Sequence, residues 1–377
     1  MNVKELLTVM VKQNASDLYL TVDSPPMFRI EGITKPYGDQ KVTAHHTEEI
    51  VSSLMTEKQK INFAETLEMN LALHYPELGR FRVNIFRQKG VTGLVIRQIK
   101  MHIHTIDELC LPSVLKDISL CTRGLVLVVG RTGTGKSTTL AAMIDYRNTS
   151  STGHIVTIED PIEFVHRHKK MIITQREIGL DTHSFENALR NVMRAAPDVI
   201  LIGEVRDRET MEAAITFAET GHLVLATLHA NNANQAMERI LNFFPHERHQ
   251  QILLQLSLNL KSIISQRLIP SLDGTRAAAI EILLDTPRVK DLIHKNQVEL
   301  LKEAMAQGIA EGMQTFDQAI FELFKQGRLD YDNALAYADS VNDLRLKIKM
   351  DKIGDEKSTT PVERKASETF KLRPDVK

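Results

Sequence analysis

The chain has 377 residues, of which 42% are hydrophobic and 25% charged, and its formal net charge is -1. This length predicts at least two domains, and the composition is that of an ordinary globular protein with a sizeable core. The balanced charge gives no electrostatic support for a nucleic-acid partner or an anionic membrane surface. The two cysteines, Cys110 and Cys121, lack the spacing of a disulfide framework or a zinc site, and we expect reduced thiols.

No uninterrupted run of about eighteen apolar residues occurs, so we expect no membrane span. Charged residues interrupt the first twelve positions, which predicts an amphipathic helix and not a signal peptide. These features predict a cytoplasmic protein.

Residues 1–100 predict a separate α/β domain. Helical spacing is expected over 5–11 and 47–64. Alternating or β-branched runs predict strands over 17–22, 27–32, 80–87 and 94–97. Residues 101–119, which contain Pro112, are expected to form a linker.

Residues 120–350 predict a second α/β domain that ends in a helical part. Apolar strands alternate with helical patterns, which indicates a parallel sheet covered by helices. The predicted strands are 125–129, 154–159, 198–203 and 222–228. From residue 251 onward the pattern predicts helix almost throughout, and the polar segment 351–377 is expected to be a disordered tail.

A complete phosphate-binding loop pattern, G-x-x-x-x-G-K-S, lies between the predicted strand 125–129 and a predicted helix. In that context successive backbone N–H groups and the helix N-terminus bind phosphate, the lysine contacts the β- and γ-phosphates, and the serine ligates Mg²⁺. The alternative is a glycine-rich turn with an accidental lysine, which the flanking elements disfavour. The predicted nucleotide-binding residues are Gly130, Thr132, Gly133, Thr134, Gly135, Lys136, Ser137 and Thr138.

Acidic residues follow two of the other predicted strands. Glu159, Asp160 and Glu163 follow the strand 154–159, where they suit Mg²⁺ binding or activation of a water, although such a segment alone is more often a polar turn. Glu204 follows the strand 198–203, whose last residue is Gly203, at the position where many phosphate-loop enzymes carry a magnesium-facing aspartate. This departure favours a role for Glu204 in positioning water.

Two further groups complete the candidate site. His222 and His229 border the last predicted strand and could sense the γ-phosphate, although one histidine beside a strand is more often structural. Arg82 and Arg97 lie on a predicted hairpin of the first domain. They are either a solvated strand face or arginines that approach a phosphate.

These four segments, in this order, resemble the Walker A, Asp box, Walker B and His box of the secretion-type hexameric ATPases. Within that family the chain looks like the type IV pilus retraction ATPases of the PilT/PilU group, and the resemblance covers residues 1–340. The segments 15–18, 25–26 and 80–84 fit that group, and the absence of a C-x-x-C pair disfavours pilus-extension and type II secretion motors. The segments 288–293, 312–318, 338–340 and Ala195-Ala196 favour the PilU side of the group.

The resemblance implies an N-terminal PAS-like α/β domain and a C-terminal RecA-like phosphate-loop ATPase domain with a helical extension. It implies ATP and Mg²⁺ as ligands, with Ser137, Glu159 and Asp160 near the metal, Glu163 as catalytic base and Glu204 assisting. It also implies that His222, His229, Arg82 and Arg97 act on the γ-phosphate or at subunit contacts.

The partners that the resemblance implies are other copies of the chain in a hexamer, a PilT-like ATPase and the pilus platform protein at the inner membrane. It implies a motor for pilus retraction in twitching motility, peripheral at the membrane base of the pilus machine. The alternatives are an assembly or regulatory subunit whose own hydrolysis is dispensable, and a nucleic-acid translocase. Balanced charge and the absence of tryptophan disfavour the last.

Overall fold

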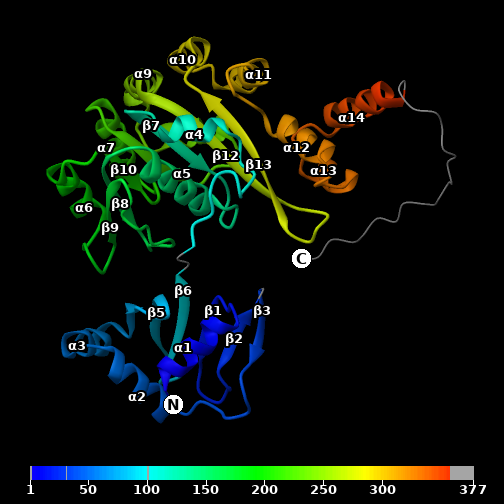
Figure 1. Cartoon of the computed structure of the whole chain (residues 1–377). Helices are drawn as coiled ribbons and strands as arrows, with labels where there is room; N and C mark the ends of the chain where they lie inside the picture. The colour runs from blue at the N-terminus through cyan, green and yellow to red at the C-terminus, as the bar shows by residue number, and fades with distance from the viewer. Residues whose placement is uncertain (1, 31, 100–101, 357–377) are drawn as a thin grey trace. The chain divides into compact units, whose positions relative to one another are not determined.

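The computed structural model describes residues 2–30, 32–99 and 102–356 of the chain (Figure 1). Contacts divide the chain into two compact units. The first contains Met1–Leu268 and Ile280–Thr315, and the second contains Ile269–Ala279 and the chain from Phe316 onward. This division does not follow the expected boundaries at residues 100, 119 and 350, and those domain limits stay predictions. None of the described helices is long and apolar enough to cross a membrane.

The N-terminal sheet is antiparallel, with the strand order β3-β2-β1-β6-β5-β4. Its strands are β1 (Asp17–Leu20), β2 (Met27–Ile30), β3 (Ile33–Pro36), β4 (Glu68–Tyr75), β5 (Gly79–Gln88) and β6 (Val91–Ile99). Along β5, buried residues alternate with partly exposed ones, which is the period-two pattern of a sheet with one covered face. The buried side chains join those of α1 (Val3–Lys12), α2 (Ala44–Leu54) and α3 (Glu57–Thr66) in one core.

The helical spacing predicted over 47–64 belongs to two helices. Thr43 and Thr56 each cap the start of one of them, and each forms a capping box with the residue three positions later, His46 and Gln59. Two caps thirteen residues apart begin two separate helices. Sequence periodicity also missed the strands β3 and β4.

The second sheet has seven strands in the order β13-β12-β7-β11-β10-β8-β9. The strands and intervening helices, in chain order, are α4 (Val114–Ser119), β7 (Gly124–Val129), α5 (Lys136–Ser150), β8 (Gly153–Glu159), β9 (Met171–Glu177), α6 (Phe185–Val192), β10 (Val199–Ile202), α7 (Arg208–Glu219), β11 (Leu223–Leu228), α8 (Ala233–Asn242), α9 (His249–Asn259), β12 (Leu260–Pro270) and β13 (Arg276–Leu284). The paired strands from β12 to β9 run parallel. Their carboxyl ends therefore meet at one edge of the sheet, where ligands of such sheets bind.

The expectation of helix from residue 251 onward was wrong for β12 and β13. Strand β12 pairs with the central strand β7 and is buried along most of its length, so its sequence lacks the alternation of a half-exposed strand. A continuously buried run of this kind cannot be told from a buried helix by periodicity. The helical prediction holds for α10 (Pro287–His294) and α11 (Leu301–Gln307).

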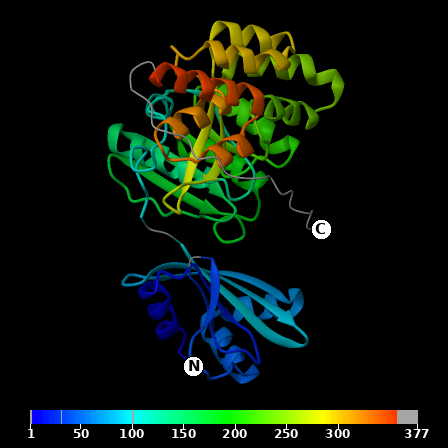
Figure 2. The same ribbon diagram turned by 90° about the vertical axis from the view of Figure 1, so that its right-hand side faces the viewer.

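The second compact unit contains the end of the β12–β13 segment with α12 (Phe316–Lys325), α13 (Tyr331–Tyr337) and α14 (Val341–Glu356). Figure 2 shows these helices as orange and red ribbons. They share a core in which Phe316, Ile320 and Ala334 are fully buried. Because α14 continues to Glu356, helix replaces the first six residues of the tail expected over 351–377, and residues 357–377 lie outside the described part.

Truncation of Phe81 is expected to destabilise the N-terminal domain. The ring is 0% exposed in the core under α1–α3, so Phe81→Ala loses its burial and leaves a cavity. We expect a loss of about 3–5 kcal/mol in the free energy of unfolding, measured by urea denaturation. Ile33→Ala is the control, since Ile33 is 62% exposed, and its expected effect is below about 0.5 kcal/mol. Equal effects of the two variants would contradict the assigned core.

Candidate active site

The phosphate loop joins the central strand β7 to α5, and its backbone packs tightly on β12. A Cβ atom at Gly130 would lie 2.7 Å from the carbonyl oxygen of Gln266, and one at Gly135 would lie 2.9 Å from the Gln266 amide nitrogen. Both glycines are therefore required by close approach as well as by their positive φ angles. The predicted loop residues lie together at the N-terminus of α5, with Lys136 and Ser137 in its first turn.

Gln266 is a site-supporting residue that the sequence did not reveal. Its side-chain oxygen accepts a hydrogen bond of 2.7 Å from the buried hydroxyl of Thr139, on the first turns of α5. It therefore ties α5 to β12 directly behind the loop. No signal for it existed while β12 was expected to be helical.

Lys136 lies folded over the loop. Its ammonium donates hydrogen bonds of 2.9 and 3.0 Å to the carbonyl oxygens of Gly130 and Arg131. Burial lowers the pKa of Lys136, and the negative charges of Glu204 and Glu163 oppose that shift. The two predicted carboxylates therefore lie close enough to the phosphate loop to act on the Lys136 ammonium.

The carboxylate of Glu204 contacts two side chains, the imidazole of His229 and the guanidinium of Arg206. Its Oε1 lies 3.0 Å from Nε2 of His229, and its Oε2 accepts a 2.7 Å hydrogen bond from Nε of Arg206. Arg206 also reaches Asp160, at 3.3 Å from Nη1 to Oδ2. Four residues from three strand ends thus form one charged chain. Arg206 was missed, although its position two residues after Glu204 was a signal.

The carboxylate of Glu159 is enclosed by neighbouring side chains that donate hydrogen bonds to it. Its Oε1 accepts hydrogen bonds from the Thr157 hydroxyl at 2.6 Å and from the Gln175 amide at 3.1 Å. Burial raises the pKa of Glu159 to about 7, and the charges of Glu163 and Glu177 act in the same direction. The group therefore exchanges a proton near neutral pH.

Gln175, on β9, was not predicted and organises the segment that carries the acidic residues. Besides Glu159, its amide nitrogen donates to the carbonyl oxygen of Phe164 at 2.9 Å, and its oxygen accepts from the backbone N–H of His166 at 2.8 Å. Glu163, which lies between these contacts, is exposed. The loop is anchored on both sides while its predicted catalytic base faces solvent.

The presence of glycine at position 203 has a local structural reason, which is the close approach of the neighbouring strand β8. A Cβ atom there would lie 3.1 Å from both Cα of Glu159 and the carbonyl oxygen of Ile158. The backbone of Gly203 also donates to Ile158 at 2.8 Å and accepts from the Thr227 hydroxyl at 2.5 Å. The close contact between β10 and β8 therefore favours glycine here, because any side chain would require the two strands to shift by a few tenths of an ångström.

The structure separates the two predicted histidines. His229 follows the carboxyl end of β11 and contacts Glu204, whereas His222 precedes β11 at the other edge of the sheet. The carbonyl of His222 accepts from Gly124, at the start of β7, and its Nδ1 lies 3.1 Å from the Phe217 carbonyl oxygen. Six strand residues, or about 20 Å, separate the two positions. His222 therefore does not lie beside the phosphate loop of its own chain, and its role at the γ-phosphate or at subunit contacts stays a prediction.

Arg82 and Arg97 are directly opposite each other on β5 and β6 of the N-terminal sheet. Arg97 donates from Nε to Oδ1 of Asp17 at 2.8 Å, and Arg29 lies 3.6 Å from the other oxygen of the same carboxylate. Arg97 and Arg29 therefore flank one buried carboxylate, and Arg82 lies on the strand beyond Arg97. Their approach to a phosphate stays a prediction.

A pocket of about 580 Å³ lies beside the phosphate loop. Arg131 and Thr132 line it from the loop. His229 and Asn231 line it from the segment between β11 and α8, and Arg239 lines it from α8. A 3.0 Å hydrogen bond from Nε of Arg131 to the Asn231 side chain links the two walls. The charged chain of Glu204 is therefore adjacent to an open space as well as to the loop.

A phosphate loop after the central strand, with acidic groups at neighbouring strand ends, defines a phosphate-loop nucleoside triphosphatase. The chain belongs to the family described as type II/IV secretion system protein, whose model matches residues 3–325. It is 54% identical over 351 residues to the type IV pilus ATPase PilU of Pseudomonas aeruginosa, covering 93% of this chain and 92% of that one. It is 43% identical over 334 residues to the retraction ATPase PilT of the same organism, covering 89% and 97%.

A crystal structure of the pilus retraction motor PilT with bound ADP matches with a TM-score of 0.86 and 38% identity, covering 92% of this chain and 99% of that one. The predicted fold class and the resemblance to PilT and PilU are thereby confirmed. The chain is an ATPase, and its homologues imply that it binds nucleotide.

Substitution of Gly203 by alanine is expected to impair hydrolysis and to lower stability. The new Cβ atom would press on the backbone at Glu159 and move the ends of β8 and β10 apart by a few tenths of an ångström. We expect kcat for ATP hydrolysis to fall about tenfold, with a loss of about 1–3 kcal/mol in stability.

Gly308→Ala is the control for Gly203→Ala, because its Cβ atom would meet chiefly the flexible end of Met313, away from the acidic strand ends. Its kcat is expected to stay within twofold of the parent. Parental kcat in Gly203→Ala would contradict the assigned role of this contact.

Acidification is expected to destabilise the parent protein through His166. Burial lowers the pKa of His166 to about 4, below its usual 6.5. Between these values the unfolded chain takes up a proton that the folded chain does not, so stability is present above pH 6.5 and falls as the pH drops toward 4. His166→Gln removes this contribution.

The measurement for His166 is the free energy of unfolding at pH 7.5 and pH 5 for both proteins. We expect the parent to lose about 1–3 kcal/mol more than His166→Gln over that interval. Equal losses would show that folding does not lower the pKa of His166 and would contradict the prediction.

Proposed function

We propose that this chain hydrolyses ATP with Mg²⁺ in a homohexameric ring and drives or assists retraction of type IV pili, together with a PilT-type motor. The observation that carries the proposal is the arrangement around Lys136. Glu204 and Glu163 act electrostatically on its ammonium, and Glu204 is tied to His229 and Arg206. The identities to PilU and PilT over most of the chain support the pilus as the place of action.

The loop residues bind the triphosphate through backbone N–H groups and the N-terminus of α5. Lys136 exchanges its two loop carbonyl partners for phosphate oxygens, which are stronger acceptors because they are charged. The residues present fit Mg²⁺, because Ser137 offers a hydroxyl in the first turn of α5 and the neighbouring strand ends supply the carboxylates of Glu159 and Asp160. When bound, the ion neutralises phosphate charge.

Glu163 is the proposed catalytic base. It is exposed on an anchored loop and influences the pKa of both Lys136 and Glu159, so it lies within the charged region of the site. Glu204 orients the water through the same carboxylate that contacts His229. A complete phosphate-loop motif together with these groups favours hydrolysis over a purely structural assembly role.

Motion follows from the loss of the γ-phosphate. Arg82 and Arg97 of the N-terminal domain and His229 of the ATPase domain are the proposed contacts to that phosphate, in the same chain or between neighbours. Their charge-assisted hydrogen bonds hold the two domains together until hydrolysis removes the shared partner. We place this cycle in the cytoplasm at the inner-membrane base of the pilus, acting on the platform protein.

Lys136→Ala tests the proposal. Purified Lys136→Ala is expected to lose at least about 99% of ATPase activity, because the lysine is the group that binds the β- and γ-phosphates. Lys170→Ala is the control, since Lys170 is exposed away from the loop. Parental hydrolysis by Lys136→Ala would reject the site.

Retraction in cells tests the biological role of the same variant. A strain that carries Lys136→Ala in place of the parent is expected to retract pili less often, in a background with the PilT-type motor present. Parental retraction alongside a loss of hydrolysis in vitro would favour the assembly role.

A further inference from the structure

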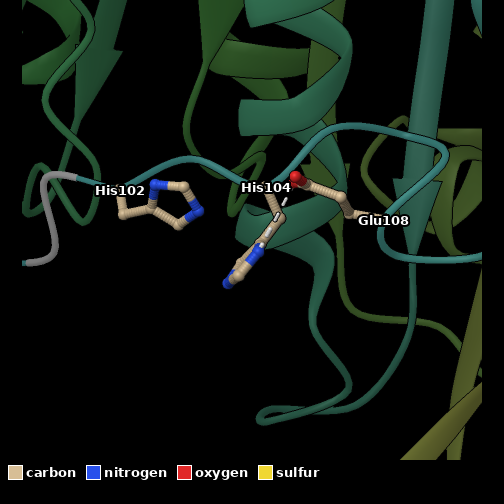
Figure 3. A group of neighbouring side chains, drawn as sticks. All are labelled: His102, His104 and Glu108. Carbon is tan, nitrogen blue, oxygen red and sulfur yellow. Dashed lines mark ion pairs between the residues drawn. The ribbon is translucent and has the colours of Figure 1, made fainter.

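Three side chains with metal-binding groups converge in the segment that follows β6 and precedes α4. His102, His104 and Glu108 each offer one ligand atom, and these atoms all lie within 4.8 Å of one another. Figure 3 shows the three side chains, with the dashed line joining His104 to Glu108. All three residues are exposed, and the ATPase mechanism uses none of them.

We propose that His102, His104 and Glu108 form a site for Zn²⁺, separate from the nucleotide's Mg²⁺. Two imidazoles and one carboxylate are a ligand set that zinc accepts, and a water completes four-coordination. Imidazole ligands favour zinc over Mg²⁺, which selects oxygen. The site therefore favours Zn²⁺ over the Mg²⁺ that accompanies the nucleotide.

The geometry needs only side-chain adjustment to bind the ion. Zinc–nitrogen bonds of about 2.1 Å place tetrahedral ligand atoms about 3.4 Å apart. From separations within 4.8 Å, closure requires movements of about 1.5 Å at most. Exposed side chains make such movements by small rotations without disturbing a core.

Glu108 is already oriented by its own turn. Its Oε2 accepts a 2.8 Å hydrogen bond from the backbone N–H of Thr105, and its backbone N–H donates to the Thr105 hydroxyl at 3.1 Å. Metal-bound carboxylates commonly have such supporting hydrogen bonds. The carboxylate is thus held toward the histidines before any ion arrives, at 3.7 Å from Nδ1 of His104.

The histidines are also in contact with each other. The rings of His102 and His104 have centroids 4.6 Å apart and are perpendicular. The exposed His104–Glu108 pair contributes little to stability, because both side chains are about half exposed. A contribution to the stability of the fold therefore does not account for the grouping of these three side chains. Zinc binding would link positions 102 and 108 and order the segment between them.

The direct test measures zinc binding to the full-length chain without an affinity tag, in excess Mg²⁺ and with a chromogenic chelator as competitor. The parent is expected to bind one more zinc ion than His104→Ala, or to bind it at least tenfold more tightly. Glu108→Gln is expected to weaken binding in the same direction. Circular dichroism of each zinc-free variant checks that the fold is unchanged.

His45→Ala is the matched control, because His45 is an exposed histidine with a histidine neighbour but is not part of the three-residue group. It is expected to bind zinc as the parent does. Equal stoichiometry and affinity in the parent and His104→Ala would overturn the proposal, as would the absence of zinc binding by the parent.

Hydrogen exchange gives a second readout that is independent of ATPase activity. Zinc is expected to slow exchange of the backbone amides between residues 103 and 110 in the parent and not in His104→Ala. Protection confined to other segments would assign the ion to another site and overturn the proposal.

Discussion

The contact between the phosphate loop and β12 is the constraint on which the rest of the active site depends. Gln266 fills the space that any side chain at Gly130 or Gly135 would need, and it fixes α5 through Thr139. This packing gives the loop its shape without a nucleotide, so little ordering entropy remains to be lost on binding. The fixed loop then determines the positions of the Lys136 ammonium and the Ser137 hydroxyl.

Charge crowding follows from that fixed position. Four carboxyl groups, those of Glu159, Asp160, Glu163 and Glu204, end near one strand edge, while Lys136 and Arg206 are the permanent cations among them. The raised pKa of Glu159 is one consequence, because burial makes its charged form costly. A divalent cation would offset the excess of negative charge at this edge, which is a physical argument for Mg²⁺ beside these strand ends.

Much of this arrangement could be predicted from local patterns. The glycine loop, the apolar strands and the acids that follow them are adjacent in sequence, and parallel strands bring their carboxyl ends together. Glu204 and His229 were placed correctly at that edge because each directly follows its strand. The side chains that support them were not predictable in this way. Gln175 and Gln266 come from β9 and β12, whose pairing is non-local. His222 borders the same strand as His229 but at its opposite end, because adjacency to a strand does not say at which end a residue lies.

The same distinction explains Gly203. In the sequence, the missing aspartate favours a water-positioning role for Glu204. The structure adds a packing cause, because a Cβ atom at Gly203 would lie only 3.1 Å from Cα of Glu159. The neighbouring strand β8 carries acidic groups at this edge, because Glu159 lies one and Asp160 two register positions beyond the end of β10. The tight contact at Gly203 and the acidic groups that follow β8 thus lie at the same place in the sheet, so a change at either position acts on the other.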